Sequence, residues 1–142
     1  MAAGSIRSVA VVGAGIMGRG IALASARARY RTSVIEPSAK AIDSARAEVE
    51  KILERARGKG EIDAGAAAAA VASLTWSRGF DAAKGADLII EAAPESVAIK
   101  AEVYKNLAPH LGPEVVIATN TSSLSITELA ATTQRPGKVI GL

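Results

Sequence analysis

The stretch SVAVVGAGIMGRGIA, residues 8–22, decides the fold of this chain. Its apolar start, Ser8–Gly13, is typical of a buried strand, and the residues from Ile16 to Ala28 have the apolar spacing of a helix. The turn between strand and helix carries glycines in the spacing G-x-G-x-x-G, namely Gly13, Gly15 and Gly18. Glycines at such a turn let the backbone approach a pyrophosphate, and the helix N-terminus offers free N–H groups. The stretch therefore predicts a dinucleotide-binding loop.

Outside this stretch, short apolar runs alternate with helical patterns. Strands are predicted at 32–36, 74–76, 86–92, 114–120 and 138–142, and helices at 39–56, 64–72, 96–110 and 125–131. The strands carry continuous Val and Ile runs, which is typical of a parallel sheet covered on both faces. We therefore predict an α/β fold in a single domain, residues 1–142, with a doubly wound, mostly parallel Rossmann sheet. The helical region 39–72, after the second strand, is predicted to be an inserted arm.

Composition narrows the classes of function. The net charge is +3 and the Lys and Arg residues are scattered, so neither nucleic acid nor a membrane surface is an expected partner. The absence of cysteine excludes a disulfide framework and a thiol nucleophile, and no metal site is expected. The first residues lack the apolar core of a secretory signal, and no apolar run is long enough to span a bilayer. A cytoplasmic location is therefore expected.

An acidic residue at the end of the second predicted strand supports the dinucleotide loop. Glu36 follows Gly18 by 18 residues, close to the usual spacing of about 20 for the residue that binds the adenosine ribose. Its carboxylate would accept hydrogen bonds from ribose hydroxyls and repel a 2′-phosphate, which favours NAD over NADP. The alternative is that Glu36 only caps the turn before Pro37. Three basic residues nearby are expected at the opposite edge of the sheet, as a solvated corner: Arg27, Arg29 and Arg31.

Two later strand ends also carry polar side chains. The first group is Glu91, Glu95 and Lys100, and the second is Asn120, Thr121, Ser122 and Ser123. Parallel strands share their carboxyl edge, so both groups are expected to face the same crevice as the glycine loop. Hydroxyls and an amide there would bind a carbonyl or hydroxyl next to the nicotinamide. The alternative for the second group is an ordinary helix-capping loop before Ile126.

Three segments, VAVVGAGIMGRGIA, ADLIIEAAPESVAIK and TNTSSLSITELA, resemble the NAD-binding domain of the L-3-hydroxyacyl-CoA dehydrogenase family, in the order of that family. The resemblance implies an enzyme that interconverts a 3-hydroxyacyl-CoA and a 3-ketoacyl-CoA with NAD as cofactor. It places Gly13, Gly15 and Gly18 at the pyrophosphate, Glu36 at the adenosine ribose, and Glu95 and Lys100 along the nicotinamide half. Asn120 would contact the nicotinamide ribose, and Ser122 would hydrogen-bond the reacting substrate oxygen. The remaining implied cofactor contacts are Ile16, Met17 and Ala92.

The chain departs from the family pattern at several positions. Glu36 stands where aspartate is usual, which adds a methylene to the ribose contact. Arg29 stands where a glycine usually ends the first helix, so an easy left-handed cap is expected to be lost. In the arm, a group of basic residues is interpreted as a solvated face, with contact to CoA phosphates as the alternative: Arg55, Arg57 and Lys59.

The chain contains a single histidine, and its position does not suit catalysis. Removing a hydride from a secondary alcohol also requires a base for the hydroxyl proton. His110 lies in a turn expected at the far edge of the sheet from the cofactor. In the family, the base is a histidine directly after a segment like VIGL, residues 139–142, and a separate helical domain completes the acyl-CoA site and forms a homodimer.

The resemblance therefore leads us to expect that Leu142 lies at a cut beside the active site, and that the chain binds NAD without turnover. Two alternatives stay open. The first is a free-standing NAD-binding module, and the second is a related β-hydroxyacid dehydrogenase that acts on a substrate without CoA.

Overall fold

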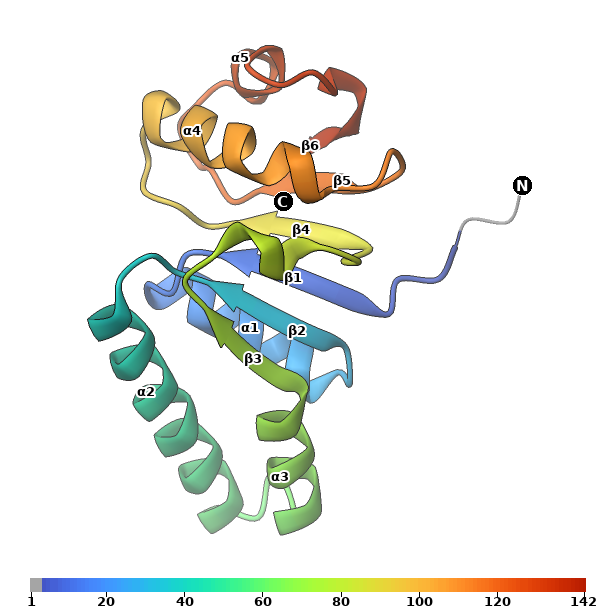
Figure 1. Cartoon of the computed structure of the whole chain (residues 1–142). Helices are drawn as coiled ribbons and strands as arrows, with labels where there is room; N and C mark the ends of the chain where they lie inside the picture. Colours follow the sequence, from blue (N-terminus) through green and yellow to red (C-terminus); the bar gives the residue numbers. More distant parts are fainter. Residues whose placement is uncertain (1–3) are drawn as a thin grey trace.

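The computed structural model describes residues 4–142, which form a sheet of six parallel strands (Figure 1). The strands are β1 (Ser8–Val12), β2 (Arg31–Ile35), β3 (Leu74–Ser77), β4 (Leu88–Glu91), β5 (Val116–Thr119) and β6 (Val139–Gly141). Their order is β3-β2-β1-β4-β5-β6, and every neighbouring pair is parallel. The order reverses between β1 and β4, so the predicted doubly wound fold is confirmed. In such a sheet, the crevice for a ligand opens at the carboxyl ends of the strands on either side of the reversal.

Helices cover both faces of this sheet. One face carries α1 (Ile16–Arg27), with the arm formed by α2 (Ala39–Gly58) and α3 (Ala64–Ser73). The other face carries α4 (Val97–Leu107) and α5 (Ile126–Ala131), and short 3₁₀ turns complete the chain at Phe80–Ala83, Ala108–His110 and Pro136–Lys138. Figure 1 shows the arm projecting past the edge strand β3, as the predicted insertion requires.

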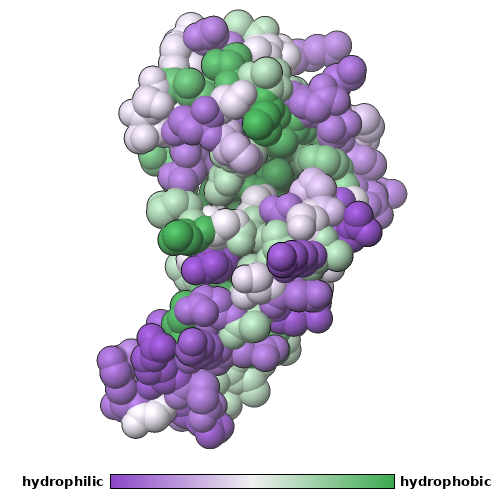
Figure 2. All heavy atoms as spheres, turned by 90° about the vertical axis from the view of Figure 1, so that its left-hand side faces the viewer, coloured by the Kyte–Doolittle hydropathy of each residue, from purple (hydrophilic) through white to green (hydrophobic). Residues whose placement is uncertain are grey.

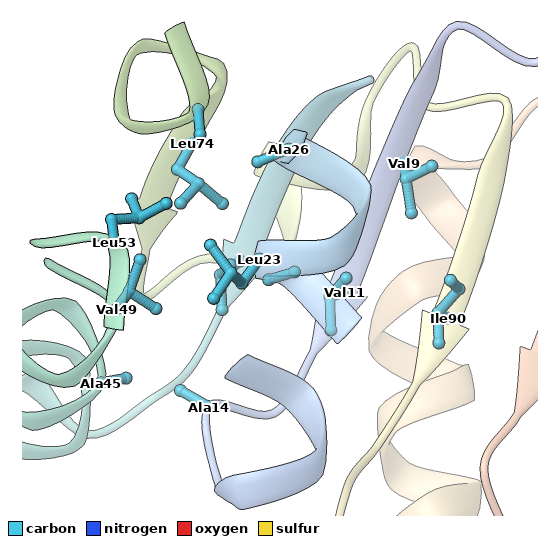
Figure 3. Packing of buried hydrophobic residues seen from close by; sticks show 13 residues of the cluster. Val9, Val11, Ala14, Leu23, Ala26, Ala45, Val49, Leu53, Leu74 and Ile90 are labelled. Carbon is cyan, nitrogen blue, oxygen red and sulfur yellow. The ribbon is translucent and has the colours of Figure 1, made fainter. Parts of the chain in front are cut away.

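The core consists of two buried clusters, one on each side of the sheet. Val9 and Val11 of β1 face α1 and the arm, whereas Ala10 and Val12 face α4 and α5. This alternation explains the continuous apolar runs of the strands, because both faces of the sheet are covered. Figure 3 shows the first cluster, in which side chains of α1 and α2 meet those of β1, β3 and β4.

Side-chain caps fix where most of the helices begin. The cap residues Ser38, Asp63, Ser96 and Ser125 each accept a hydrogen bond from the amide three residues further on. The bond from the Glu128 amide to Ser125 Oγ, 3.2 Å, is one half of the capping box that the spacing predicts. The predicted helix 96–110 ends earlier, at Leu107, and continues as a 3₁₀ turn around Pro109, which has no amide hydrogen to donate.

The end of α1 differs from the expectation for Arg29. This residue has φ +71°, so the left-handed cap forms even though glycine is absent. The Arg29 amide donates to Ala26 O (3.0 Å), and the Tyr30 amide donates to Ser25 O (3.1 Å). These two bonds are the Schellman motif, with arginine at the position that glycine normally takes. The cap is therefore kept at the cost of backbone strain.

Two kinds of feature are absent from the part of the chain that the structure describes. Among residues 4–142, no helix is long and apolar enough to cross a membrane. In the same part of the chain, no group of three or more His, Cys, Asp or Glu side chains is arranged to hold a metal ion.

Candidate functional site

The glycine loop between β1 and α1 lies at the point where the strand order reverses. Gly13 has φ +103°, and its amide donates to Ile35 O of β2 (2.9 Å). A Cβ at Gly13 would lie 2.5 Å from Ala92 O, and one at Gly18 would lie 1.9 Å from Gly13 O. Both positions therefore exclude any other residue, because the backbone segments approach too closely. These contacts explain two of the three glycines of the motif.

Gly15 differs from the other two glycines. A Cβ there would meet no protein atom within 4 Å, so no contact within the described chain requires glycine at this position. Gly15 is also the N-cap of α1, where no side chain caps the helix and no acidic residue stands in the first turn. Ile16 and Met17, which follow it, are exposed by 76% and 57%. An uncapped helix start facing open space suits a phosphate group, so the loop fits the pyrophosphate of a dinucleotide.

Glu36 at the end of β2 is directly connected to the glycine loop. Its Oε2 accepts a hydrogen bond from the Ala14 amide, and its Oε1 accepts one from the Ser38 amide, both at 3.1 Å. The second bond confirms that Glu36 caps the turn before α2, which was the alternative role. The first bond holds the carboxylate beside the loop, where an adenosine ribose would lie. The ribose contact itself stays a prediction.

The β4 and β5 ends do not present all their polar residues to the crevice. Glu91 and Lys100 are both fully buried, and Lys100 Nζ donates to Glu91 Oε2 (2.5 Å) and to Ala93 O (3.0 Å). In this structure Lys100 is paired inside the protein, and its predicted contact along the nicotinamide half stays a prediction. Its ammonium group lies on the buried side of the loop that follows β4 and is enclosed by protein. Pairing with Glu91 offsets the cost of burying both charges.

Two further members of this buried cluster, Tyr104 and Thr119, were not predicted from the sequence. Tyr104 OH and Thr119 Oγ1 each donate to Glu91 Oε1 at 2.7 Å. Burial raises the pKa of the Tyr104 phenol well above its usual range, so the group remains a donor. A signal for Tyr104 was present, since it follows Lys100 by four residues and so shares its helix face. Thr119 pairs with Glu91 in the sheet register, which no single segment reveals.

Glu95 and the loop after β5 meet at the surface. Thr121 Oγ1 donates to Glu95 Oε1, and the Ser122 amide donates weakly to Glu95 Oε2 (3.4 Å). The hydrogen bond from Thr121 lowers the pKa of the Glu95 carboxyl, so this group is ionised near neutral pH. Thr121 Oγ1 also accepts from the Leu124 amide (3.1 Å), which shapes the turn that carries Ser122. Glu95 and Ser122 are exposed, and the structure brings them together as predicted.

Asn120 and Ala92 border the same crevice, and both are half-buried. The Asn120 amide donates to Glu91 O (2.8 Å), and the Ala92 amide donates to Val12 O (2.8 Å). Backbone bonds therefore join the ends of β1, β4 and β5 side by side. This places Asn120 in the same row of strand ends as the glycine loop.

The other candidate residues lie away from this edge. His110 lies in the turn before β5, beside Gly85, Ala86 and Asp87 at the amino ends of the strands. The basic residues of the arm are all exposed: Arg55, Arg57 and Lys59. Figure 2 looks at the carboxyl edge of the sheet and shows a mostly hydrophilic arm below a more apolar, hollowed upper half.

The sheet order, the glycine loop and the acid after β2 together define a dinucleotide-binding Rossmann domain. The family described as "3-hydroxyacyl-CoA dehydrogenase, NAD binding domain" matches residues 8–142. The chain belongs to this family of NAD-binding domains.

Individual relatives agree with this assignment. The chain is 39% identical over 139 residues to a 3-hydroxybutyryl-CoA dehydrogenase of Mycobacterium tuberculosis, covering 97% of this chain and 49% of that protein. The crystal structure of M. tuberculosis FadB2 superimposes with a TM-score of 0.94 at 38% identity, over 98% of this chain and 49% of that one. The (S)-3-hydroxybutyryl-CoA dehydrogenase PaaH1 of Ralstonia eutropha gives 0.92 at 39% identity, over 96% and 48%. The chain thus spans about half the length of these relatives.

Proposed function

We propose that this chain is the cofactor-binding half of an enzyme that oxidises a 3-hydroxyacyl-CoA to a 3-ketoacyl-CoA, or catalyses the reverse reduction of the 3-ketoacyl-CoA. The observation that carries the proposal is the shared edge of the sheet: the glycine loop and the Ser122 loop both lie at the carboxyl ends of strands, the first after β1 and the second after β5, with only β4 between them. A cofactor on the first would extend toward a substrate oxygen on the second. When bound, NAD accepts the hydride that leaves C3 of the substrate.

In this proposal the residues of the chain bind and orient. The start of α1 holds the pyrophosphate, with Gly15 leaving room for it. Glu36 accepts hydrogen bonds from the adenosine ribose, and Asn120 does the same for the nicotinamide ribose. Ser122 is exposed and its amide donates to Glu95. In this proposal its hydroxyl donates to the C3 oxygen of the substrate.

The reaction also requires a base that takes the hydroxyl proton while the C3–O bond becomes a carbonyl. His110 lies at the opposite edge of the sheet and does not serve this role. We therefore propose that the base, together with the remaining acyl-CoA contacts and a homodimer interface, belongs to the part of the longer relatives that this chain does not span.

The experiment is a titration of the 142-residue chain with NADH and with NADPH, in which binding is measured by isothermal calorimetry and by cofactor fluorescence. We expect saturable binding of NADH and weaker binding of NADPH. Reduction of acetoacetyl-CoA by the chain alone is expected to be undetectable. No binding of NADH at millimolar concentration would refute the cofactor site, and robust turnover would refute the assignment of the base to another segment.

A further inference from the structure

We propose that the buried Glu91 carboxylate is a positioning group for the nicotinamide half of the site, which it sets through the loop after β4 without touching the cofactor. This inference rests on the proposed function and extends it to residues that no ligand contact would reveal. Glu91 and Lys100 are both 0% exposed. Glu91 therefore offers no exposed atom to a ligand in the crevice of this structure.

The carboxylate accepts hydrogen bonds from two directions. Its Oε2 receives the Ala93 amide (2.8 Å) and Lys100 Nζ (2.5 Å), and its Oε1 receives the hydroxyls of Tyr104 and Thr119, both at 2.7 Å. One acceptor group thus gathers donors from the loop after β4, from α4 and from β5. Among the described residues, no buried side-chain polar atom lacks a hydrogen-bond partner, so the cluster is fully satisfied. A satisfied network of this kind has little freedom to rearrange.

The cluster fixes both polar groups of one residue in the loop. The Ala93 amide donates to Glu91, and the Ala93 carbonyl accepts from Lys100 Nζ at 3.0 Å. Pro94 and Glu95 follow directly and are exposed. The ion pair between Glu91 and Lys100, on the buried side of this loop, therefore fixes the direction in which the chain runs from Ala93 to Glu95. Glu95 in turn holds the loop that carries Ser122.

The same segment contacts the two other parts of the site. Ala92, next to Glu91, has its carbonyl against Gly13 of the glycine loop, where a Cβ would be only 2.5 Å away. The Glu91 carbonyl accepts the Asn120 amide at 2.8 Å, and Thr119 precedes Asn120 directly. Loss of the Thr119 hydroxyl would therefore remove the side-chain hydrogen bond between the end of β5 and Glu91. Glu91 Oε1 would then accept from one donor fewer.

Among the described residues, the adenosine half of the site shares no hydrogen bond with this cluster. Its polar groups are the uncapped start of α1 and Glu36, which is held by the Ala14 and Ser38 amides. A defect in the Glu91 cluster should therefore weaken the binding of ligands that reach the nicotinamide half and spare ligands that end at the diphosphate. NADH and ADP are a matched pair of probes for this difference, because ADP lacks both the nicotinamide and its ribose.

The test compares Thr119→Val with Thr32→Val in this chain. Both threonines are buried, at 0% and 1% exposure, and each hydroxyl donates one hydrogen bond, but Thr32 bonds Tyr30 O at the far end of β2. Calorimetry with NADH and with ADP is run on both variants, on the parent chain and on Thr119→Ser. Thermal unfolding of every variant is recorded alongside. Tyr104→Phe removes the second hydroxyl and serves if Thr119→Val does not fold.

We expect Thr119→Val and Tyr104→Phe to bind NADH about fivefold more weakly, which corresponds to one hydrogen bond, with ADP affinity unchanged. Thr32→Val should lose similar stability and keep both affinities, and Thr119→Ser should restore NADH binding. Equal losses for NADH and ADP, or no loss for either, would overturn the positioning role while leaving the cofactor site intact. A parent chain that binds neither ligand would instead overturn the proposed function and this inference with it.

Discussion

Replacing Arg29 by glycine should stabilise the fold, although it removes a side chain. Arg29 holds φ +71° at the end of α1, a conformation that costs an L-residue with a side chain about 1–2 kcal/mol. Glycine adopts it freely but loses about 0.5–1 kcal/mol more conformational entropy on folding. The balance favours Arg29→Gly by roughly 0.5–1 kcal/mol, since the Schellman hydrogen bonds from the Arg29 and Tyr30 amides are kept.

The matched control is Arg27→Gly. Arg27 is the last residue of α1, it is exposed like Arg29, and its loss changes the charge in the same way. Because Arg27 is helical, glycine there should cost about 0.5–1 kcal/mol. The two changes, two positions apart, are thus expected to have opposite signs.

Urea unfolding and thermal unfolding at fixed pH, both monitored by circular dichroism, measure the stability of the two variants. For a chain of this size, the melting temperature of Arg29→Gly should rise by about 2–4 °C. If Arg29→Gly loses as much stability as Arg27→Gly, the left-handed conformation is either absent or without cost, and the explanation given for this helix end is wrong.

Three further predictions concern the site and its pH dependence. Glu36→Ala should weaken NADH and narrow its preference over NADPH, because a negative charge beside the ribose is lost; an unchanged ratio of the two dissociation constants would contradict its assigned role. Gly13→Ala should cost more than about 2 kcal/mol in urea unfolding, since the new Cβ meets Ala92 O at 2.5 Å, whereas Gly15→Ala should keep stability and lose NADH binding. Hydrogen bonds from the Arg7 and Ser8 amides lower the pKa of Asp87 below its ordinary value of 3.8. Its contribution to stability is therefore present above that value and fades as pH falls through the lower folded-state pKa, so Asp87→Asn should flatten the acid side of a pH–stability curve, and an unaltered curve would count against this.

The alternation of strands and helices could be predicted from local sequence, because each element carries its own signal. The Val and Ile runs of β1 and β4 mark strands buried on both faces, and Ser38 and Ser125 mark helix starts. The glycine loop was predictable for the same reason, since its residues are neighbours in the chain. These features need no knowledge of which strand lies beside which.

The buried cluster behind the site could not be predicted in the same way. Whether Lys100 points to a ligand or into the core depends on the position of Glu91 and Thr119, and that position is set by the pairing of β4 with β5. A lysine after a strand end is usually exposed, so the residue type does not predict the burial of Lys100. The prediction that Arg29 removes the left-handed cap was wrong for another reason. The backbone at Arg29 adopts a strained conformation, and the hydrogen bonds of the cap are kept.

The Glu91 cluster has a consequence for attempts to graft this site onto another scaffold. A transplant of the short loop Ala92–Glu95 alone would leave behind the ammonium and hydroxyls that hold Ala93 in place. The smallest portable unit includes Glu91, Lys100, Tyr104 and Thr119, which come from two strands and a helix and span 29 positions of the chain. A transplanted loop without these residues should carry the sequence of this site but not its geometry.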